Sequence, residues 1–452
     1  MEKKRVLVLD RTYSVRYMKS ELFETVIVCL NRERKNEIEK AGLKTVGCFE
    51  EEYDDIPVSV IPDNYLINSF DSDRFLNRYG YDKRLEILGK EISFWTRILD
   101  EYRPDAIVNE IVTIEFAEVM AIEAEKRKIP YYRWNSMPFA PMNMWVENKP
   151  FNSLMGRSFW DSIIPSAQDK KDAEERLENI RVKHTRPYYV QGLRKSYSVV
   201  IKQKAKAFWA FLNLVYKHYY YKYSGKFYYE DYYPIRKINV DRTVSKILHK
   251  QYDKLDFSNE TEYLFYPLHF EPEAAIEYVG YYFNDQPMLI GRIAHAMKPN
   301  QKLIIKEHPQ QTGALMTAHY RELKRRYPNI VFIPGSVSAY DIFSKVKCVI
   351  TLCGTAGFEA WVCGKPVICF GDVFYRDFPG VTSCKDFETL HNIIRKDIFE
   401  KVEDEVILEY LSKVCHHLTH IFPRLINGKY EYSNLMEITK KVEFYLKENE
   451  EQ

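Results

Sequence analysis

The residues best suited to chemistry follow short apolar runs in the C-terminal half of the chain. After the run Cys348–Leu352 comes the small-residue turn Gly354–Gly357, which opens directly into a helix. Glycines let the backbone approach a ligand, and the free amides at a helix N-terminus suit a phosphate group. We therefore expect Gly354, Thr355 and Gly357 to bind an anionic, nucleotide-like ligand, with Thr355 capping the helix and Glu359 holding ribose hydroxyls. An ordinary capped turn between strand and helix is the alternative.

A charged trio follows a second apolar run. Leu303–Ile305 leads into Lys306, Glu307 and His308, and Pro309 then fixes the direction of the chain. The pKa of a histidine lies near neutrality, so His308 can donate to a phosphate or protonate a leaving group. Lys306 can neutralise the same charge. A structural role for the histidine is the alternative.

Two further segments carry polar groups after predicted strands. His269, Glu271 and Glu273 follow the run that ends at Tyr266. We place His269 with the donor-binding residues, and we assign Glu273 as a catalytic base or orienting group, although it also fits a helix cap. In the segment after Ile333, Ser336 is expected to contact a nucleobase through its backbone.

That last segment also holds a predicted helix start. Ser338 followed by Asp341 three residues later is a variant of the capping box. Capping is the simpler of the two interpretations of this segment.

The N-terminal half should supply the acceptor side of a reaction. Glu110 follows the apolar run Ile107–Val108 and is the first choice there for a catalytic base, with helix capping as the alternative. Trp134 ends the next run and is either a sugar-stacking platform or a buried core residue. The Asp71–Asp73 triplet imitates a metal-binding motif but lacks a preceding strand, so we expect a surface turn and no metal site.

The spacing of the apolar runs predicts the elements that position these residues. Strand-sized runs alternate with helix-like stretches in both halves, which is typical of parallel sheets covered by helices. The expected fold is α/β, with two Rossmann-like domains facing a cleft. The predicted domains are an acceptor domain (1–165), a helical insertion (166–255), a nucleotide-sugar-binding domain (256–400) and C-terminal helices (401–452) that return toward the first domain.

The insertion has an unusual composition. Residues 181–226 contain eleven Lys or Arg and no Asp or Glu, and they are rich in Tyr, Phe and Trp. Cationic and aromatic side chains suit an anionic membrane surface, so peripheral membrane contact is one interpretation. A helical face in solvent, with its aromatics packed on the domains, is the other.

Bulk composition restricts the partners. The net charge of +2 over 452 residues argues against a nucleic-acid partner. No segment has the roughly 20 apolar residues of a spanning helix. The eight cysteines form no CxxC pair, so we expect reduced thiols and a cytoplasmic protein, with any membrane contact at the inner face of the cell membrane.

Taken as a set, the motifs resemble a known family. Phe265–Glu273, Lys306–Pro309, Gly354–Ala360 and Gly364–Pro366 are similar to segments of the bacterial capsular polysaccharide biosynthesis family, over about residues 260–380. That family includes GT-B glycosyltransferases, among them β-Kdo transferases that use CMP-Kdo. The resemblance implies that His308, Thr351, Gly354 and Thr355 bind the donor nucleotide, and that neither a metal nor a cofactor is required.

The resulting hypothesis is a glycosyltransferase that moves a sugar from a nucleotide-activated donor, with CMP-Kdo among the candidates. The acceptor would be a glycan or a lipid-linked glycan in capsule or surface polysaccharide synthesis. A teichoic-acid-type polyol-phosphate transferase with a CDP-activated donor is one alternative, although Leu352 stands where such enzymes usually have Asp. A UDP-sugar 2-epimerase and a non-catalytic donor-binding scaffold are the others.

Overall fold

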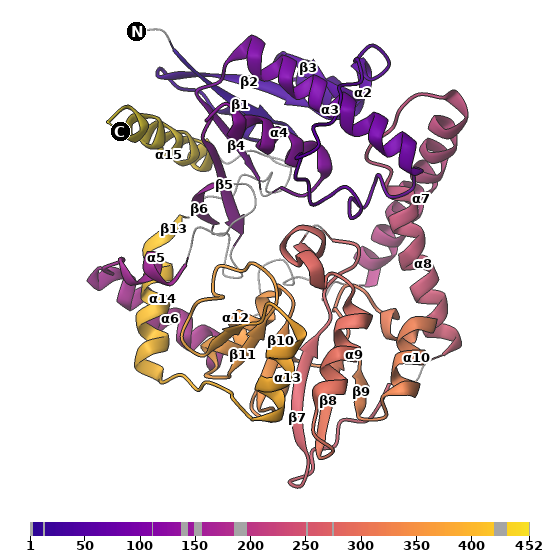
Figure 1. Cartoon of the computed structure of the whole chain (residues 1–452), viewed down its shortest axis with the longest axis vertical. Helices are drawn as coiled ribbons and strands as arrows, with labels where there is room; N and C mark the ends of the chain where they lie inside the picture. Colours follow the sequence, from indigo (N-terminus) through magenta and orange to yellow (C-terminus); the bar gives the residue numbers. More distant parts are fainter. Residues whose placement is uncertain are drawn as a thin grey trace. The chain divides into compact units, whose positions relative to one another are not determined.

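The chain folds into two compact α/β units in the computed structural model. The structure describes residues 3–11, 14–110, 112–136, 143–148, 156–184, 197–249, 252–273, 275–419 and 432–451. Unit 1 comprises Met1–Leu154, Pro187–Tyr233 and His417–Gln452, and unit 2 comprises Met155–Arg186 and Pro234–His416. Each unit is built on one sheet (Figure 1).

The sheet of unit 1 has seven strands in the order β13-β6-β5-β4-β1-β2-β3. The central strands are parallel, whereas β6 and β13 run antiparallel to their neighbours. The strands are β1 (Lys4–Leu9), β2 (Phe23–Cys29), β3 (Gly47–Cys48), β4 (Ala106–Glu110), β5 (Tyr131–Ser136), β6 (Asn143–Asn148) and β13 (Leu418–Thr419). The helical segments are η1 (Ser14–Tyr17), α1 (Arg32–Lys40), α2 (Phe49–Glu52), α3 (Tyr81–Tyr102), α4 (Glu115–Lys126), α7 (Tyr197–Ser224) and α15 (Tyr432–Glu451).

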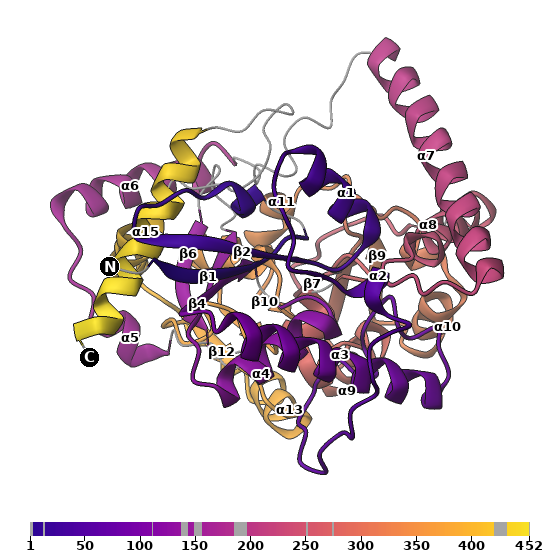
Figure 2. The same ribbon diagram turned by 90° about the horizontal axis from the view of Figure 1, so that it is seen from above.

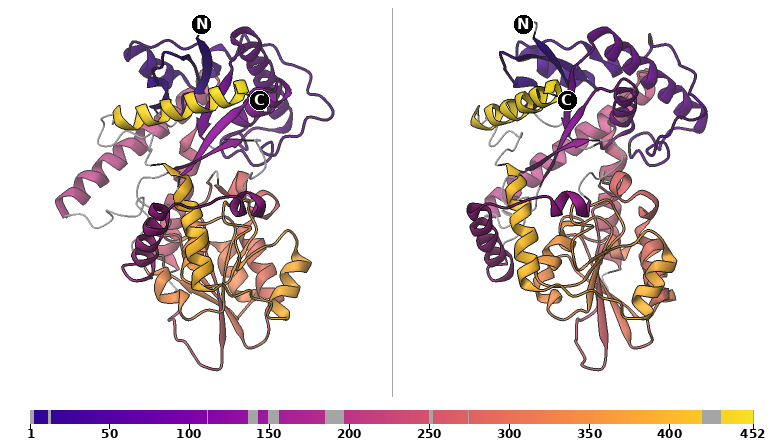
Figure 3. Two further views of the ribbon diagram at one scale, coloured as in Figure 1. Left: turned by 90° about the vertical axis from the view of Figure 1, so that its left-hand side faces the viewer. Right: turned by 60° about the vertical axis from the view of Figure 1, so that its left-hand side comes forward.

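The last helix completes the core of unit 1. Ile438, Val442 and Leu446 recur every four residues on α15, so their side chains form one helical stripe. The stripe is buried against residues of the central strands, including Val6 and Val108. Figure 3 shows α15 beside the strands of this sheet.

The sheet of unit 2 has six parallel strands in the order β12-β11-β10-β7-β8-β9. They are β7 (Glu262–Pro267), β8 (Gln301–Lys306), β9 (Ile330–Ile333), β10 (Cys348–Thr351), β11 (Val367–Cys369) and β12 (Val381–Ser383). Because helices cover both faces, these strands are nearly continuous apolar runs with buried side chains.

Twelve helical segments lie in or lead into unit 2 within the described residues. Three of them are the single-turn segments η2 (Ala275–Val279), η3 (Tyr281–Phe283) and η4 (Ala314–Met316). The others are α5 (Arg157–Asp161), α6 (Ala167–Arg181), α8 (Tyr232–Leu248), α9 (Gln286–Ala296), α10 (Ala318–Arg326), α11 (Ala339–Phe343), α12 (Thr355–Val362), α13 (Phe387–Arg395) and α14 (Asp404–His417).

The predicted fold class is confirmed, because both sheets are Rossmann-like with parallel central strands. The division into units differs from the predicted boundaries. The predicted insertion 166–255 is shared, with its middle part in unit 1 and its two ends in unit 2. Of the two C-terminal helices, α15 returns to unit 1 as expected, whereas all but the last residue of α14 belongs to unit 2. None of the helices in the described part of the chain combines the length and hydropathy of a transmembrane span.

Candidate functional site

The strand order of unit 2 reverses direction at β7, which makes a topological switch point between β7 and β10. From β7 the chain builds β8 and β9 on one side, then returns to build β10, β11 and β12 on the other. The loops that follow β7 and β10 therefore leave in opposite directions from neighbouring strands. In open α/β sheets ligands bind at this switch point, beyond the carboxyl ends of the strands. His269 follows β7, and Thr351 ends β10 at the same edge.

His269 joins the two loops. Its Nε2 accepts a hydrogen bond from the Cys353 amide at 3.1 Å, and its Nδ1 lies 3.3 Å from Oε1 of Gln286. Because Nε2 is an acceptor, the ring proton is on Nδ1 and is donated to Gln286. Burial lowers the pKa of His269 to about 4, which keeps the ring neutral. The predicted donor-binding residue thus has both ring nitrogens engaged within unit 2, and it positions the loop after β10.

The turn after β10 is packed too tightly for larger residues. A Cβ on Gly354 would lie 3.0 Å from Nε2 of His269, and a Cβ on Gly357 would lie 2.5 Å from the Tyr375 hydroxyl. The Gly354 amide donates to the Thr351 hydroxyl at 3.1 Å. Thr351 itself is fully buried, so its hydroxyl shapes the turn from inside.

The start of α12 lies one residue earlier than the sequence suggested. Gly354 is the N-cap residue, and Thr355 is the first helical residue. The expectation that Thr355 caps the helix is therefore wrong. Its half-buried side chain lies at the helix start beside the amides that suit a phosphate.

A buried lysine and a buried glutamate lie near this turn. Lys306 ends β8 and is 6% exposed, and Glu359 on α12 is 8% exposed. Burial raises the pKa of Glu359 to about 7, although the hydroxyl of Tyr340 and the charge of Lys306 act in the opposite direction. The carboxyl end of β8 and the first turns of α12 thus place opposite charges at the same edge of the sheet.

His308 follows Lys306 and has a different environment from His269. Burial, followed by the positive charge of Lys306, lowers the pKa of His308 to about 4. Its Nδ1 accepts a hydrogen bond from the Gln310 amide at 3.3 Å, so Nε2 carries the proton. The ring is half-buried and packs edge-on against Phe270, 5.6 Å between ring centres. The contact with Phe270, together with the hydrogen bond from the Leu268 amide to the Lys306 carbonyl at 2.9 Å, shows that the loops after β7 and β8 meet.

Glu307, between these two residues, has a role that the sequence analysis missed. One carboxylate oxygen accepts from the Gly313 and Leu315 amides at 2.8 and 3.1 Å, and the other accepts from the Tyr252 hydroxyl at 2.6 Å. The glutamate is 1% exposed. It therefore holds the loop that carries His308 by accepting backbone amides.

The remaining predicted residues of unit 2 lie on the surface of its loops. Ser336 is exposed in a turn closed by the Val337 amide and the Pro334 carbonyl, 3.2 Å apart. Ser338 is the N-cap of α11, as predicted, but its side chain makes no capping hydrogen bond in the described structure. Glu273 is exposed, and its charge adds to the effect of burial, which is the main cause that raises the pKa of the Cys353 thiol in the turn after β10.

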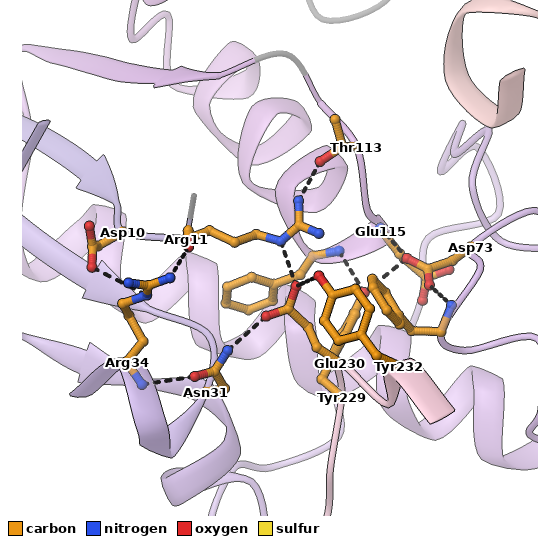
Figure 4. A network of polar contacts seen from close by, with 12 residues as sticks. Asp10, Arg11, Asn31, Arg34, Asp73, Thr113, Glu115, Tyr229, Glu230 and Tyr232 are labelled. Carbon is orange, nitrogen blue, oxygen red and sulfur yellow. Dashed lines mark hydrogen bonds and ion pairs between the residues drawn. The ribbon is translucent and has the colours of Figure 1, made fainter. Parts of the chain in front are cut away.

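Unit 1 has its own switch point, between β1 and β4, and a segment of the chain fills it. Arg11 follows β1 and donates from Nε to Oε1 of Glu230 at 2.8 Å, while its Nη1 donates to the Thr113 hydroxyl. Asn31, after β2, donates to the other oxygen of Glu230 at 2.7 Å. Figure 4 shows this network, in which Glu230 is 8% exposed and Arg11 is 9% exposed.

Two expectations for unit 1 remain open and one is wrong. Glu110 is the last residue of β4, and Trp134 is its partner in β5, but both side chains lie outside the described residues. Asp73, expected in a surface turn, is 1% exposed. It accepts from the Glu115 amide at 2.7 Å and from the Tyr229 hydroxyl at 3.2 Å, so it caps the start of α4 from within the core.

Among the residues that the structure describes, no three His, Cys, Asp or Glu side chains are grouped to hold a metal ion. A groove of about 700 Å³ runs between α9 and α10, lined in part by Arg292, His295 and Tyr327. None of the predicted site residues lines this groove.

Residues 168–449 match the family model described as "Capsule polysaccharide biosynthesis protein", a range that covers more than half of the 452 residues. The chain belongs to this family. Family membership confirms the resemblance inferred from the motifs and places the chain in capsule polysaccharide biosynthesis.

Other known proteins are similar to this capsule biosynthesis protein over different lengths. Protein FixF of Sinorhizobium fredii is 29% identical over 83 residues, which are 18% of this chain and only 19% of that protein. The beta Kdo 2,7 transferase of Thermosulfurimonas dismutans KpsC is 13% identical, with a TM-score of 0.37 over 97% of this chain and 99% of that one. Anabaena HepE, solved with UDP and glucose, is 11% identical, with a TM-score of 0.29 over 98% and 100% of the two chains. The family assignment rests on the family match rather than on these structures.

Proposed function

We propose that unit 2 of this capsule biosynthesis protein binds a nucleotide-activated sugar at the β7/β10 switch point and that the enzyme transfers the sugar to a glycan or a lipid-linked glycan. CMP-Kdo is among the candidate donors. The proposal is supported mainly by one observation: the loops after β7, β8 and β10 meet, since His269 accepts from the Cys353 amide and the Phe270 ring packs against His308.

The chemistry of this edge suits a phosphate. The His308 ring is neutral and carries its proton on Nε2, because Gln310 donates to Nδ1. A neutral imidazole donates one hydrogen bond without repelling Lys306. The amides at the start of α12 add donors and the positive end of the helix dipole. Glu359 lies one turn into that helix, and in this proposal it accepts hydrogen bonds from ribose hydroxyls.

Transfer would then rest on stabilising the departing phosphate. The bond between the anomeric carbon and the phosphate oxygen breaks, and the acceptor oxygen forms the new bond to that carbon. The donor groups around His308 stabilise the negative charge that develops on the leaving phosphate. The acceptor hydroxyl gives its proton to a carboxylate, for which Glu110 and Glu273 remain the predicted candidates.

Nucleotide binding tests the proposal directly. Thermal unfolding of the full chain would be followed with CMP, CDP, UDP and GDP. Stabilisation by CMP alone favours a CMP-sugar donor, by CDP alone a polyol-phosphate donor, and by UDP alone UDP-sugar chemistry, including 2-epimerisation. We expect His308→Ala to weaken binding of the preferred nucleotide roughly 10- to 100-fold, because a hydrogen bond to a charged group contributes about 1.5–3 kcal/mol.

The matched control is His319→Ala, which removes an exposed histidine on α10. This variant should bind like the wild type. Failure of all four nucleotides to stabilise the chain, or equal affinity of the His308→Ala variant and the wild type, would refute the donor site.

A further inference from the structure

Helix α7 of unit 1 has two faces with different surroundings. One face is fixed to the unit: Lys217 forms an ion pair with Glu33, and Nδ1 of His218 lies 2.6 Å from a carboxylate oxygen of Asp231. On the same face, the ring of Tyr221 stacks on Tyr228 with 4.3 Å between ring centres. Position 221 lies four residues after 217 and three after 218, so the three side chains lie on one side of the helix.

The opposite side of α7 is exposed and aromatic. Trp209 is 69% exposed, Tyr216 is 66% exposed and Tyr223 is 79% exposed. Leu212 and Tyr220, also exposed, lie between them at helical spacing. Tyr216 stacks on Tyr220 one turn away, with 5.9 Å between ring centres, so the rings form an ordered surface. Figure 2 shows α7 extending away from the sheet of unit 1.

The charge around this face has one sign. Lys206, Lys222 and Lys226 are exposed on or just after α7, and residues 181–226 contain no Asp or Glu. Two copies of such a surface would bring like charges together, which disfavours self-association through it. An anionic bilayer instead attracts the lysines and accommodates Trp and Tyr rings at its interface.

We propose that the exposed face of α7 docks on an anionic lipid surface, with Trp209, Tyr216 and Tyr223 entering the headgroup region. The fixed face then holds unit 1 against the membrane through Lys217 and His218. Docking of this kind concentrates the enzyme on a membrane surface and does not need a helix that spans the membrane. The inference depends on α7 alone and does not require the donor site to be correct.

Vesicle co-sedimentation of the full chain tests the docking face. The probes are vesicles of phosphatidylcholine with and without phosphatidylglycerol. We expect the wild type to sediment with the anionic vesicles, less so at high salt, and hardly with the neutral ones. The triple variant Trp209→Ser, Tyr216→Ser, Tyr223→Ser should have a partition coefficient roughly tenfold lower. This loss corresponds to about 1.4 kcal/mol of interfacial binding free energy.

Two further variants separate docking from misfolding and from charge alone. Leu66→Ser with Tyr81→Ser removes two other exposed apolar side chains of unit 1 and should sediment like the wild type. Lys206→Glu with Lys222→Glu should lose the preference for anionic vesicles. Equal sedimentation of the aromatic triple variant and the wild type would overturn the proposal. So would a concentration-dependent dimer, formed without lipid, that the triple variant abolishes.

Discussion

The acid sensitivity of unit 2 should depend on one histidine that bridges two loops. His269 is 9% exposed, and its Nε2 accepts from the Cys353 amide. Its pKa falls from an ordinary value of 6.5 to about 4 in the folded chain because of burial. Below pH 6.5 the His269 ring therefore binds a proton in the unfolded chain but not in the folded chain. The free energy of unfolding falls as the pH is lowered toward 4.

The size of the effect follows from these two values. Between pH 7 and pH 5 a histidine that shifts from 6.5 to about 4 costs roughly 2 kcal/mol of unfolding free energy. His269→Gln removes the titrating ring but keeps an acceptor for the Cys353 amide. Between pH 7 and pH 5, we expect the free energy of unfolding of this variant to fall by about 2 kcal/mol less than that of the wild type. His308, whose pKa is also lowered, leaves a residual slope in both proteins.

Urea denaturation at pH 7 and pH 5, followed by tryptophan fluorescence, measures the difference. Trp361 is fully buried in unit 2 and reports on its unfolding. His319→Gln, an exposed histidine in the same unit, is the matched control and should follow the wild type. If His269→Gln and the wild type lose the same free energy between the two pH values, the assignment of His269 as a neutral bridge is refuted.

Two other substitutions should disturb the switch points. Gly357→Ala should destabilise unit 2 by about 1–3 kcal/mol in urea denaturation, since the new methyl group would meet the Tyr375 hydroxyl at 2.5 Å; an unchanged midpoint would show that the turn relaxes freely. Glu230→Gln should destabilise unit 1 by about 3–5 kcal/mol, because it removes the carboxylate charge that pairs with the buried Arg11 guanidinium. Restored stability in the double variant Glu230→Gln, Arg11→Met would attribute that loss to the ion pair, and a failure to restore it would contradict this account.

The strands of unit 2 were predictable because buried parallel strands are continuous apolar runs. β7, β8 and β10 all fall on apolar runs named from the sequence, whereas β11 and β12, of three residues each, are too short to give a clear signal alone. The 22-residue helix α3 was missed, although Ile87, Ile92, Trp95 and Leu99 bury one side of it. Their helical spacing was the available signal.

The bonds that shape the sites were less predictable. Arg11 and Glu230 are 219 residues apart, and only the folded topology brings Glu230 to the end of β1. Nothing local marks Asp73 as a cap for α4, since its partner amide is 42 residues later. The role of Glu307 was easier to predict, because the two backbone amides that donate to its carboxylate follow within eight residues.

The place of α15 in the core has a consequence for synthesis on the ribosome. Val6, Val108 and the rest of the first sheet lack part of their hydrophobic cover until Leu446 has emerged. At 5–20 residues per second, the interval between the completion of β6 and that moment is about 15–60 s. During that interval unit 2 can be translated and can fold, while the sheet of unit 1 still lacks α15. The first half of the nascent chain is thus the last to mature, and a fragment that ends before α15 would leave an apolar sheet face open to aggregation.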